Sequence, residues 1–441
     1  MMPTRSHNTR PNIVQIICHD LGQYIGALGA PIETPNIDAL ASEGVLFSNY
    51  ACTAAQCSPS RGSIMTGRYP HNNGLVGLAH LGWRVGANEV TLPMYLNRAG
   101  YHTRLIGHQH ENAEAPMLGY QEIESPPHDA LAIASALDDF LQGDAQDGRP
   151  FYVNCGIAEP HRPYEREGYD RDDPETLETL PYLPDRPGIR EDLAGLHGLI
   201  WRLDEAVGRM RESLEASGLA EETLFIFTTD HGIAMPRAKG TCYDPGIMTT
   251  LIARWPARFE GGRVQDELLT NCDLLPTILD VVGVDVPAQV DGRSFLALLD
   301  GDDRYEPRED IFCEMNWHDQ YNPMRAVRTT RYKYVRNFGR RPLVYMPADI
   351  YVAPAGEAMK EDFYNEVRPR EELYDLDRDP LEMTNVIDDE AYDDVAWTLR
   401  TRVHNWMVET NDPLLYGDYA PARLQRERDE ERPLDNGVPH V

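Results

Sequence analysis

The sequence predicts an α/β fold in which a mostly parallel central sheet lies between helices, followed by a smaller C-terminal α+β subdomain with an antiparallel sheet. Two observations predict this. Apolar strand-like runs alternate with amphipathic helical segments up to about residue 304, and β-rich runs separated by turns follow. We therefore expect a main domain over residues 10–304, a subdomain over 305–412 and a charged tail over 413–441.

Each element follows from a local pattern. Short runs rich in β-branched and aromatic residues are typical of buried strands, and Pro35 after Thr34 is typical of a helix start. In the main domain the expected strands cover residues 12–18, 101–107, 151–157, 223–230 and 248–256, and the expected helices 34–47, 129–143 and 191–218. In the subdomain, strands and turns are expected over 310–316, 324–338 and 371–386, with a closing helix over 391–410.

Polar residues directly follow four of these strands. The clusters are CHD at 18–20, GHQH at 107–110, AEPHRPY at 158–164 and TTDHG at 228–232. Because ligands of open α/β sheets bind beyond the carboxyl ends of the strands, we expect the four clusters to form one site. The long Pro- and acid-rich segment 160–191 is expected to form a wall of that site.

The composition limits the function and the compartment. A net charge of −31 argues against nucleic acid or an anionic membrane surface as a partner. No run is long and apolar enough for a membrane span, and the first residues lack a signal-peptide pattern, so we expect a cytoplasmic protein. Seven irregularly spaced cysteines predict no disulfide framework.

One stretch, CSPSRGSIMTGR from Cys57 to Arg68, has an unusual composition. A helix that begins at Ser60 would place Cys57 at its N-terminal end, where free N–H groups and the helix dipole favour anions. A buried cysteine that only packs is the alternative. The Pro-Ser-Arg that follows Cys57 favours a chemical role.

The Cys-x-Pro-Ser-Arg motif and the GSIMTGR that follows it resemble the signature of the type I, formylglycine-dependent sulfatases of the alkaline phosphatase superfamily. The resemblance extends from PNIVQIICHDLG to ELYDLDRDPLEMTNV and is greatest to the branch that includes heparan N-sulfatase. It implies an alkaline-phosphatase-like sandwich with a catalytic domain at 10–304. It also implies that a formylglycine-generating enzyme converts Cys57 to formylglycine (3-oxoalanine), whose hydrated aldehyde attacks sulfur while Arg61 neutralises it.

The resemblance further implies one divalent cation beside residue 57. Its implied ligands are Asp20, Asp230, His231 and the residue derived from Cys57. The family has two aspartates where this chain has His19 and Asp20, so His19 is either a further ligand or a residue behind the ligands. Resemblance favours Ca²⁺, whereas an imidazole ligand favours Mn²⁺ or Zn²⁺.

Four more residues receive roles from the resemblance. His110 and His161 are candidate catalytic residues, with His161 as general acid. Lys239 and His108 are candidate substrate-binding residues, and His108 stands where the family has a lysine. An imidazole at this position would hold a sulfate only when protonated, which favours activity at lower pH.

We therefore predict a metal-dependent sulfatase that hydrolyses a sulfate ester or sulfamate of a small or sugar-like substrate. A phosphonate monoester or phosphodiester hydrolase with the same nucleophile is one alternative. A catalytically silent binding protein with this fold is another, because two motif positions depart from the family. The sequence leaves open whether the chain forms a homo-oligomer.

Overall fold

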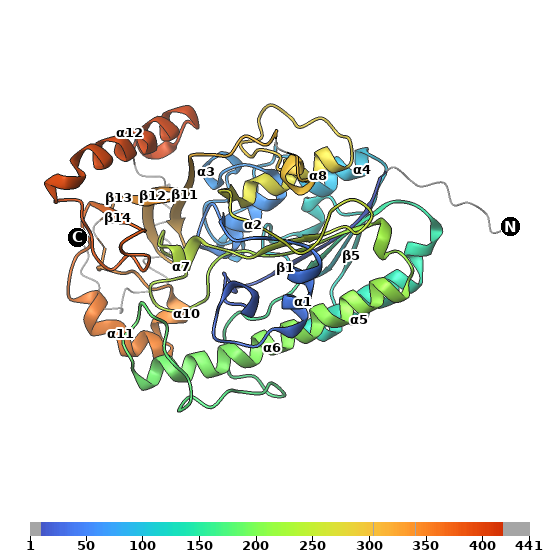
Figure 1. The fold of residues 1–441 in the computed structure, drawn as a ribbon, viewed down its shortest axis with the longest axis horizontal. Helices are drawn as coiled ribbons and strands as arrows, with labels where there is room; N and C mark the ends of the chain where they lie inside the picture. Colours follow the sequence, from blue (N-terminus) through green and yellow to red (C-terminus); the bar gives the residue numbers. More distant parts are fainter. Residues whose placement is uncertain (1–9, 303, 340, 418–441) are drawn as a thin grey trace.

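A computed structural model describes residues 10–302, 304–339 and 341–417. Its centre is an eight-stranded sheet in the order β5-β4-β6-β1-β7-β8-β2-β9 (Figure 1). The strands from β5 to β7 are all parallel, and β8 runs antiparallel to both of its neighbours. The predicted mostly parallel sheet is confirmed. The strands are β1 (Asn12–Cys18), β2 (Val45–Phe47), β4 (His102–Gly107), β5 (Glu122–Glu124), β6 (Phe151–Gly156), β7 (Thr223–Thr229), β8 (Leu251–Arg254) and β9 (Arg263–Gln265), and β3 (Tyr50–Ala51) pairs separately with β10 (Leu269–Thr270).

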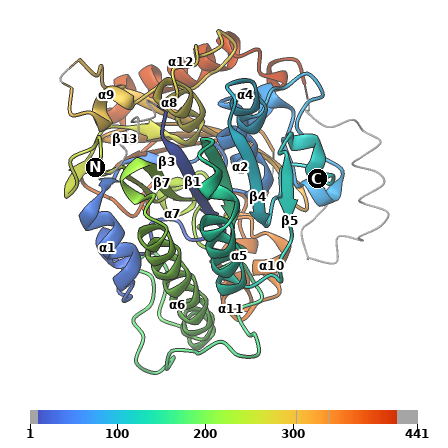
Figure 2. The same ribbon diagram turned by 90° about the vertical axis from the view of Figure 1, so that its right-hand side faces the viewer.

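Helices cover both faces of this sheet (Figure 2). Helices α1, α5 and α6 pack on one face, and α2, α4 and α8 pack on the other. The helices of this part are α1 (Pro35–Glu43), α2 (Cys57–Thr66), α3 (Pro70–Asn73), α4 (Leu92–Arg98), α5 (Ala130–Gln142), α6 (Pro187–Ala216), α7 (Asp244–Ile247), α8 (Leu274–Val281) and α9 (Leu296–Leu299).

One predicted helix is too long. We expected a helix over residues 34–47, but α1 ends at Glu43 and Val45–Phe47 forms β2. Gly44 separates them with an extended backbone, and the Val-Leu-Phe run then pairs with β8. The β propensity of three apolar residues after a glycine outweighs the helical pattern before it.

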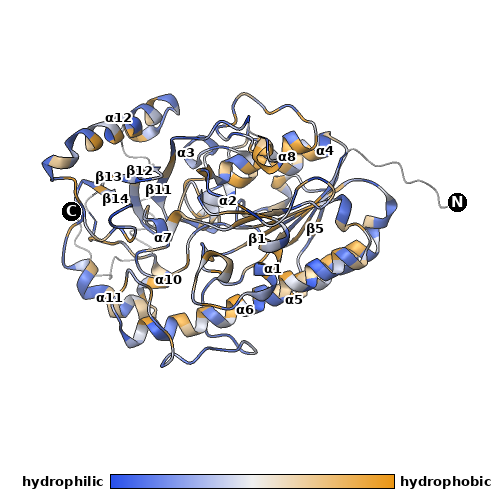
Figure 3. Cartoon of the chain, in the orientation of Figure 1, coloured by the Kyte–Doolittle hydropathy of each residue, from blue (hydrophilic) through white to orange (hydrophobic). Residues whose placement is uncertain are grey.

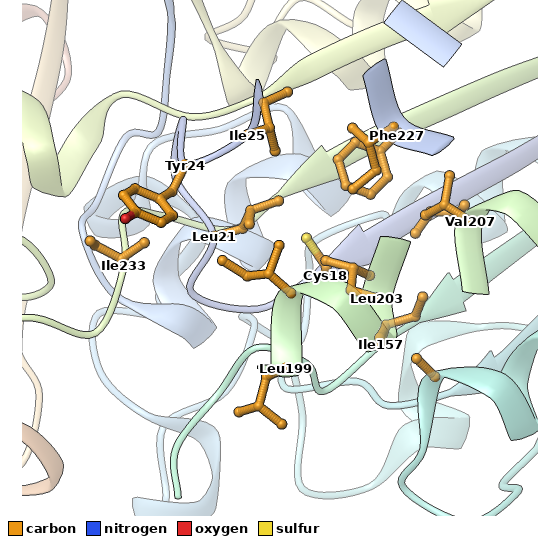
Figure 4. Packing of buried hydrophobic residues seen from close by; sticks show 14 of the residues in the cluster. Cys18, Leu21, Tyr24, Ile25, Ile157, Leu199, Leu203, Val207, Phe227 and Ile233 are labelled. Atoms are coloured by element: carbon orange, nitrogen blue, oxygen red, sulfur yellow. The ribbon is translucent and has the colours of Figure 1, made fainter. Parts of the chain in front are cut away.

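The hydrophobic core lies on both faces of the sheet, because successive side chains of a strand point to opposite faces. Val14 and Ile16 of β1 belong to the cluster under α5 and α6, whereas Ile13 and Ile17 belong to the cluster under α2, α4 and α8. Figure 4 shows Leu199, Leu203 and Val207 of α6 among the side chains from the β1 and β7 region. Figure 3 shows hydrophobic and hydrophilic residues alternating along α6, as one buried face requires.

A second sheet carries the C-terminal part, as predicted. Its four strands, β11 (Asp310–Trp317), β12 (Tyr321–Thr329), β13 (Tyr332–Asn337) and β14 (Glu371–Asp375), are antiparallel, and α12 (Asp393–Glu409) covers them (Figure 1). The helices α10 (Ala348–Tyr351) and α11 (Pro354–Tyr364) lie between β13 and β14 in the chain.

Buried polar contacts join the two sheets' regions. His71 of α3 lies with Nδ1 2.5 Å from a carboxylate oxygen of Glu314 on β11. Arg325 of β12 binds Asp412, which is fully buried just after α12.

The domain boundaries stay a prediction, and residues 418–441 of the expected tail lie outside the described residues. No helix in the described ranges is long and apolar enough to cross a membrane.

The packing of α6 makes a stability prediction. Leu203 is fully buried against the sheet, so Leu203→Ala should lower the free energy of unfolding by about 2–5 kcal/mol. Glu205 lies two residues away on the exposed side and pairs with Arg209 at the surface, so Glu205→Ala should cost less than about 0.5 kcal/mol. Urea unfolding of both variants measures the difference. Equal losses would mean that α6 does not bury the face described.

Candidate active site

The four predicted polar clusters meet at one edge of the sheet. Strands β4, β6, β1 and β7 are adjacent and parallel, so their carboxyl ends lie side by side. His108 follows β4, His161 follows β6, Asp20 follows β1, and Asp230 follows β7. The convergence inferred from the sequence is therefore present in the structure.

Two glycines let the loops after β1 and β7 touch. The N–H of Gly22 donates to the carbonyl of His231 over 2.8 Å. A Cβ on Gly22 would lie 2.9 Å from Cα of Gly232, and a Cβ on Gly232 would lie 1.9 Å from the carbonyl oxygen of Pro245. Asp20 itself has φ +49°, a left-handed conformation that aspartate tolerates better than most residues. The close approach brings Asp20 and Asp230 together.

Cys57 enters this edge from α2. The helix begins at Cys57 itself, so the predicted start at Ser60 is wrong by one turn. Pro59 fits the first turn because that turn needs no N–H from it. The Sγ of Cys57 lies 3.3 Å from Nε2 of His231 and 3.9 Å from Oδ1 of Asp20. The thiol is therefore both at a helix N-terminus and inside the polar cluster.

Four side chains here could hold a cation. Ligand atoms of Asp20, Cys57, Asp230 and His231 all lie within 4.8 Å of one another, and all four residues are buried. Nδ1 of His231 lies 2.8 Å from the carbonyl of Gly232, which leaves Nε2 facing Asp20 at 3.0 Å. A backbone partner on one imidazole nitrogen is the usual way to orient the other toward a metal. The donor set fits a divalent cation.

The electrostatics of the cluster favour the charged forms of its acids. Burial opposes ionisation of Asp20, but Lys239, His161 and His231 hold the pKa of its carboxyl well below the usual range. Burial likewise raises the pKa of the Cys57 thiol, and Lys239 and His231 overcome that effect and hold it well below the usual range. The site therefore stabilises negative charge at the position of residue 57.

Arg61 binds Asp230, one of the two carboxylates of the site. Its Nε donates to Oδ2 of Asp230 over 3.0 Å, and its Nη2 donates to the carbonyls of Ile17 and Cys18. The guanidinium is fully buried, and Nη1 has no hydrogen-bond partner within the described ranges. Arg61 thus fixes Asp230 against the end of β1 and keeps one nitrogen available.

Lys239 has a partner that the sequence did not suggest. Its Nζ lies 2.9 Å from Asp20 and 3.0 Å from Asp349, and the side chain is fully buried. Asp349 belongs to α10 and comes from a segment, MPADIY, with no motif to mark it. Only the folding of α10 against the main domain brings this carboxylate to the site.

The remaining predicted histidines gather around His19. The ring centroid of His19 lies 4.8 Å from that of His108, 5.9 Å from that of His110 and 5.2 Å from that of His161. Partial burial and the charges of His19 and Arg61 lower the pKa of His108. This environment disfavours the protonated imidazole that the predicted sulfate contact of His108 requires.

Two further residues of this group were missed. His80 lies with Nδ1 2.9 Å from Nε2 of His110, and Glu111 accepts a hydrogen bond from the backbone N–H of His110. Glu111 directly follows the GHQH cluster, and that adjacency was the available signal; the structure buries its side chain. His80 comes from a segment without a strand, where no signal existed.

Comparisons with known proteins match this chain to one family. The sequence profile of the sulfatase family matches residues 11–284, and that of the C-terminal region of N-sulphoglucosamine sulphohydrolase matches residues 237–348. An ulvan-active sulfatase of Formosa agariphila is 27% identical over 91% of this chain and 76% of its own length. The human N-sulphoglucosamine sulphohydrolase is 29% identical over 91% of both chains.

Solved structures share the fold. The phosphonate monoester hydrolase of Agrobacterium radiobacter superposes with a TM-score of 0.71 at 21% identity, covering 91% of this chain and 96% of its own. The fold class predicted from the sequence is thereby confirmed. Because the sulfatase profile matches more than half of the residues, this chain belongs to the sulfatase family and is a sulfuric ester hydrolase.

Proposed function

We propose that this protein hydrolyses the sulfate ester or sulfamate of a sugar-like substrate, with formylglycine formed from Cys57 and one divalent cation held by Asp20, Asp230 and His231. The observation that carries the proposal is the position of Cys57 Sγ, 3.3 Å from His231 at the first residue of α2. The relatives that are named for sulfated sugars support the substrate class.

Two groups would supply the bond-breaking chemistry: the cation would polarise a sulfate oxygen as a Lewis acid, and the hydrated formylglycine would be the nucleophile. The chain's own residues prepare the site for them. Arg61 holds Asp230 in place, and Lys239 holds Asp20. Because α2 begins at Cys57, the free N–H groups of its first turn favour an anion beside residue 57.

His161 has the geometry of a proton donor. Its Nδ1 lies 2.5 Å from the carbonyl of Arg162, so Nδ1 carries a hydrogen and Nε2 is the ring nitrogen left to face a substrate. Nε2 lies 3.9 Å from Asp20, and the side chain is 32% exposed. We assign His161 the protonation of the leaving group, because it is close to the acids and open to a substrate.

A neighbouring cavity is suited to the substrate's sugar. It has a volume of about 620 Å³ and lies beside the site, since Asp349 both binds Lys239 and lines the cavity. Arg162 and Tyr164 form another part of its wall, from the segment that was expected to be a pocket wall. Volumes of a few hundred Å³ are typical of sites for small ligands.

Maturation must come before folding. Cys57 is only 1% exposed, so a formylglycine-generating enzyme would have no access to the thiol in the folded chain. We therefore propose that this enzyme acts on the unfolded motif.

The ligands of the proposed cation site indicate a class of metal rather than one element. The two carboxylates suit Ca²⁺, and the imidazole of His231 adds affinity for Mn²⁺ or Zn²⁺.

The nucleophile makes the first prediction. When the chain is produced with a formylglycine-generating enzyme, mass spectrometry should find the peptide with residue 57 lighter by the difference between CH₂SH and CHO. Aryl sulfate hydrolysis should then fall at least about a thousandfold in Cys57→Ala. Faster turnover of an aryl phosphonate ester than of the aryl sulfate would favour the phosphonate hydrolase instead. An intact thiol with no activity would favour the silent binding protein.

The charge of the site makes a second prediction. Burial and Arg61 oppose a charge on His19, yet Asp230 and Asp20 raise the pKa of His19 to about 10. In metal-free protein this proton stabilises the fold fully below about pH 6.5, the unfolded value, and the stabilisation is lost as pH rises through 10. The free energy of unfolding should therefore fall from pH 6.5 to 10.

Urea unfolding at several pH values measures this slope. His19→Gln should flatten it, whereas His404→Gln, which changes an exposed histidine of α12, should leave it as it is. Saturating Mn²⁺ should also reduce the slope, because the cation replaces the charge of the proton. A slope that is unchanged in His19→Gln would contradict this electrostatic account.

The cavity makes a third prediction. Val352 lines it and is 72% exposed, so Val352→Trp should fill the cavity without disturbing the core. We expect kcat/KM for a sulfated disaccharide to fall at least about tenfold, and kcat/KM for an aryl sulfate to change less than about twofold. Val264→Trp, at a 64% exposed position on the edge strand β9, is the matched control. Equal effects on both substrates would place the sugar elsewhere.

A further inference from the structure

Three imidazoles form a second group beside the site just described. Ligand nitrogens of His19, His108 and His110 all lie within 4.8 Å of one another. His19 comes from the end of β1, and the other two follow β4, so two separate strand ends build the group. This trio shares no residue with the set of Asp20, Cys57, Asp230 and His231, although His19 also belongs to a group with Asp20, Cys57 and His161.

Two of the three rings have a polar neighbour at one ring nitrogen. Nδ1 of His19 lies 2.9 Å from Asp230, and Nε2 of His110 lies 2.9 Å from His80. Nδ1 of His110 and Nε2 of His108 are both buried and, among the described residues, have no hydrogen-bond partner. Buried imidazole nitrogens without partners are costly unless a ligand satisfies them.

The backbone of this loop is preorganised. The N–H of His108 donates to the carbonyl of Gly156 over 2.8 Å, where a Cβ on Gly156 would collide with the His108 carbonyl oxygen at 1.6 Å. The side-chain oxygen of Gln109 accepts hydrogen bonds from the N–H groups of Glu111 and Asn112. The two histidines are therefore presented by a fixed turn rather than by a free loop.

We propose that His19, His108 and His110 bind a second metal ion, a divalent transition metal such as Zn²⁺, next to the cation of the proposed function. Three nitrogen ligands with a fourth position open to solvent or substrate are the arrangement of catalytic zinc sites. Imidazole donors without a carboxylate favour Zn²⁺ and its transition-metal neighbours over Ca²⁺. Zinc–nitrogen bonds of about 2.0–2.1 Å require nitrogens about 3.3 Å apart, so nitrogens that lie within 4.8 Å of one another must approach by up to about 1.5 Å.

The second ion would complete the substrate site. Lys239 is engaged by Asp20 and Asp349, and His108 stands where the resemblance to the sulfatases implies a lysine. A divalent ion on the three imidazoles would supply positive charge for a sulfate oxygen at that position. This use of the ion rests on the proposed function, whereas the metal site rests on the geometry alone.

The test counts metal ions per chain. Tag-free protein in a Cys57→Ala background, which removes the thiolate as a zinc ligand, is stripped with a chelator, equilibrated with Zn²⁺ and separated from free ion. Elemental mass spectrometry should find two zinc ions per chain. His108→Ala and His110→Ala should each lose one, and both side chains are half-buried, so the fold should tolerate their loss. Urea unfolding of both variants, with a free energy of unfolding close to that of the background protein, would confirm that the fold is retained.

A neighbouring histidine is the matched control. His128 is exposed, and its ring centroid lies 5.9 Å from that of His108, yet it is outside the trio. His128→Ala should keep two ions, and Co²⁺ in place of Zn²⁺ should give a visible absorption that changes in His108→Ala and not in His128→Ala.

The outcomes separate the two proposals. One ion per chain that survives His108→Ala but is lost in Asp20→Asn would overturn the second site and leave the proposed function standing. Two ions in both the background and His108→Ala would also overturn it. An ion lost only in His108→Ala, with none lost in Asp20→Asn, would support the trio and count against the cation of the proposed function.

Discussion

Two carboxylates buried side by side, Asp20 and Asp230, impose the central constraint on this molecule. The N–H of Asp20 donates to Asp230 over 2.9 Å, and neither side chain reaches solvent. Buried negative charge is tolerated only when positive charge compensates it. Arg61 and Lys239 supply part of that charge, and the histidines around them supply more. The site is therefore organised to receive cations, and through them an anionic substrate.

This local field opposes that of the whole chain, whose net charge is −31. Two of the three lysines are buried inside carboxylate clusters, where their charge acts only at short range. Lys239 is buried between Asp20 and Asp349, and Lys333 is buried between Asp244 and Glu382. The carboxylates around each buried ammonium group hold it in a fixed position. The charge of a lysine on the surface, in contrast, would be screened by salt. Binding of a sulfate thus depends on a short-range pocket rather than on long-range attraction.

Much of the fold and of the candidate site could be predicted because the relevant signals are local. The strand ends that carry Asp20, His108, His161 and Asp230 were visible as apolar runs followed by polar clusters. Three features were not visible. The start of α2 at Cys57 depends on how the chain enters the helix, the strand at 45–47 depends on a partner in β8, and Asp349 reaches Lys239 only through the packing of α10. Long-range contacts decide the last two of them.

The central claim is that residue 57 sits beside a cation held by Asp20, Asp230 and His231. The most direct measurement is anomalous diffraction from crystals of the matured protein grown with Mn²⁺. The account predicts an anomalous peak at coordination distance from Asp20, Asp230 and His231, with the side chain of residue 57 pointing at it. A peak only elsewhere, or none at this edge of the sheet, would contradict it.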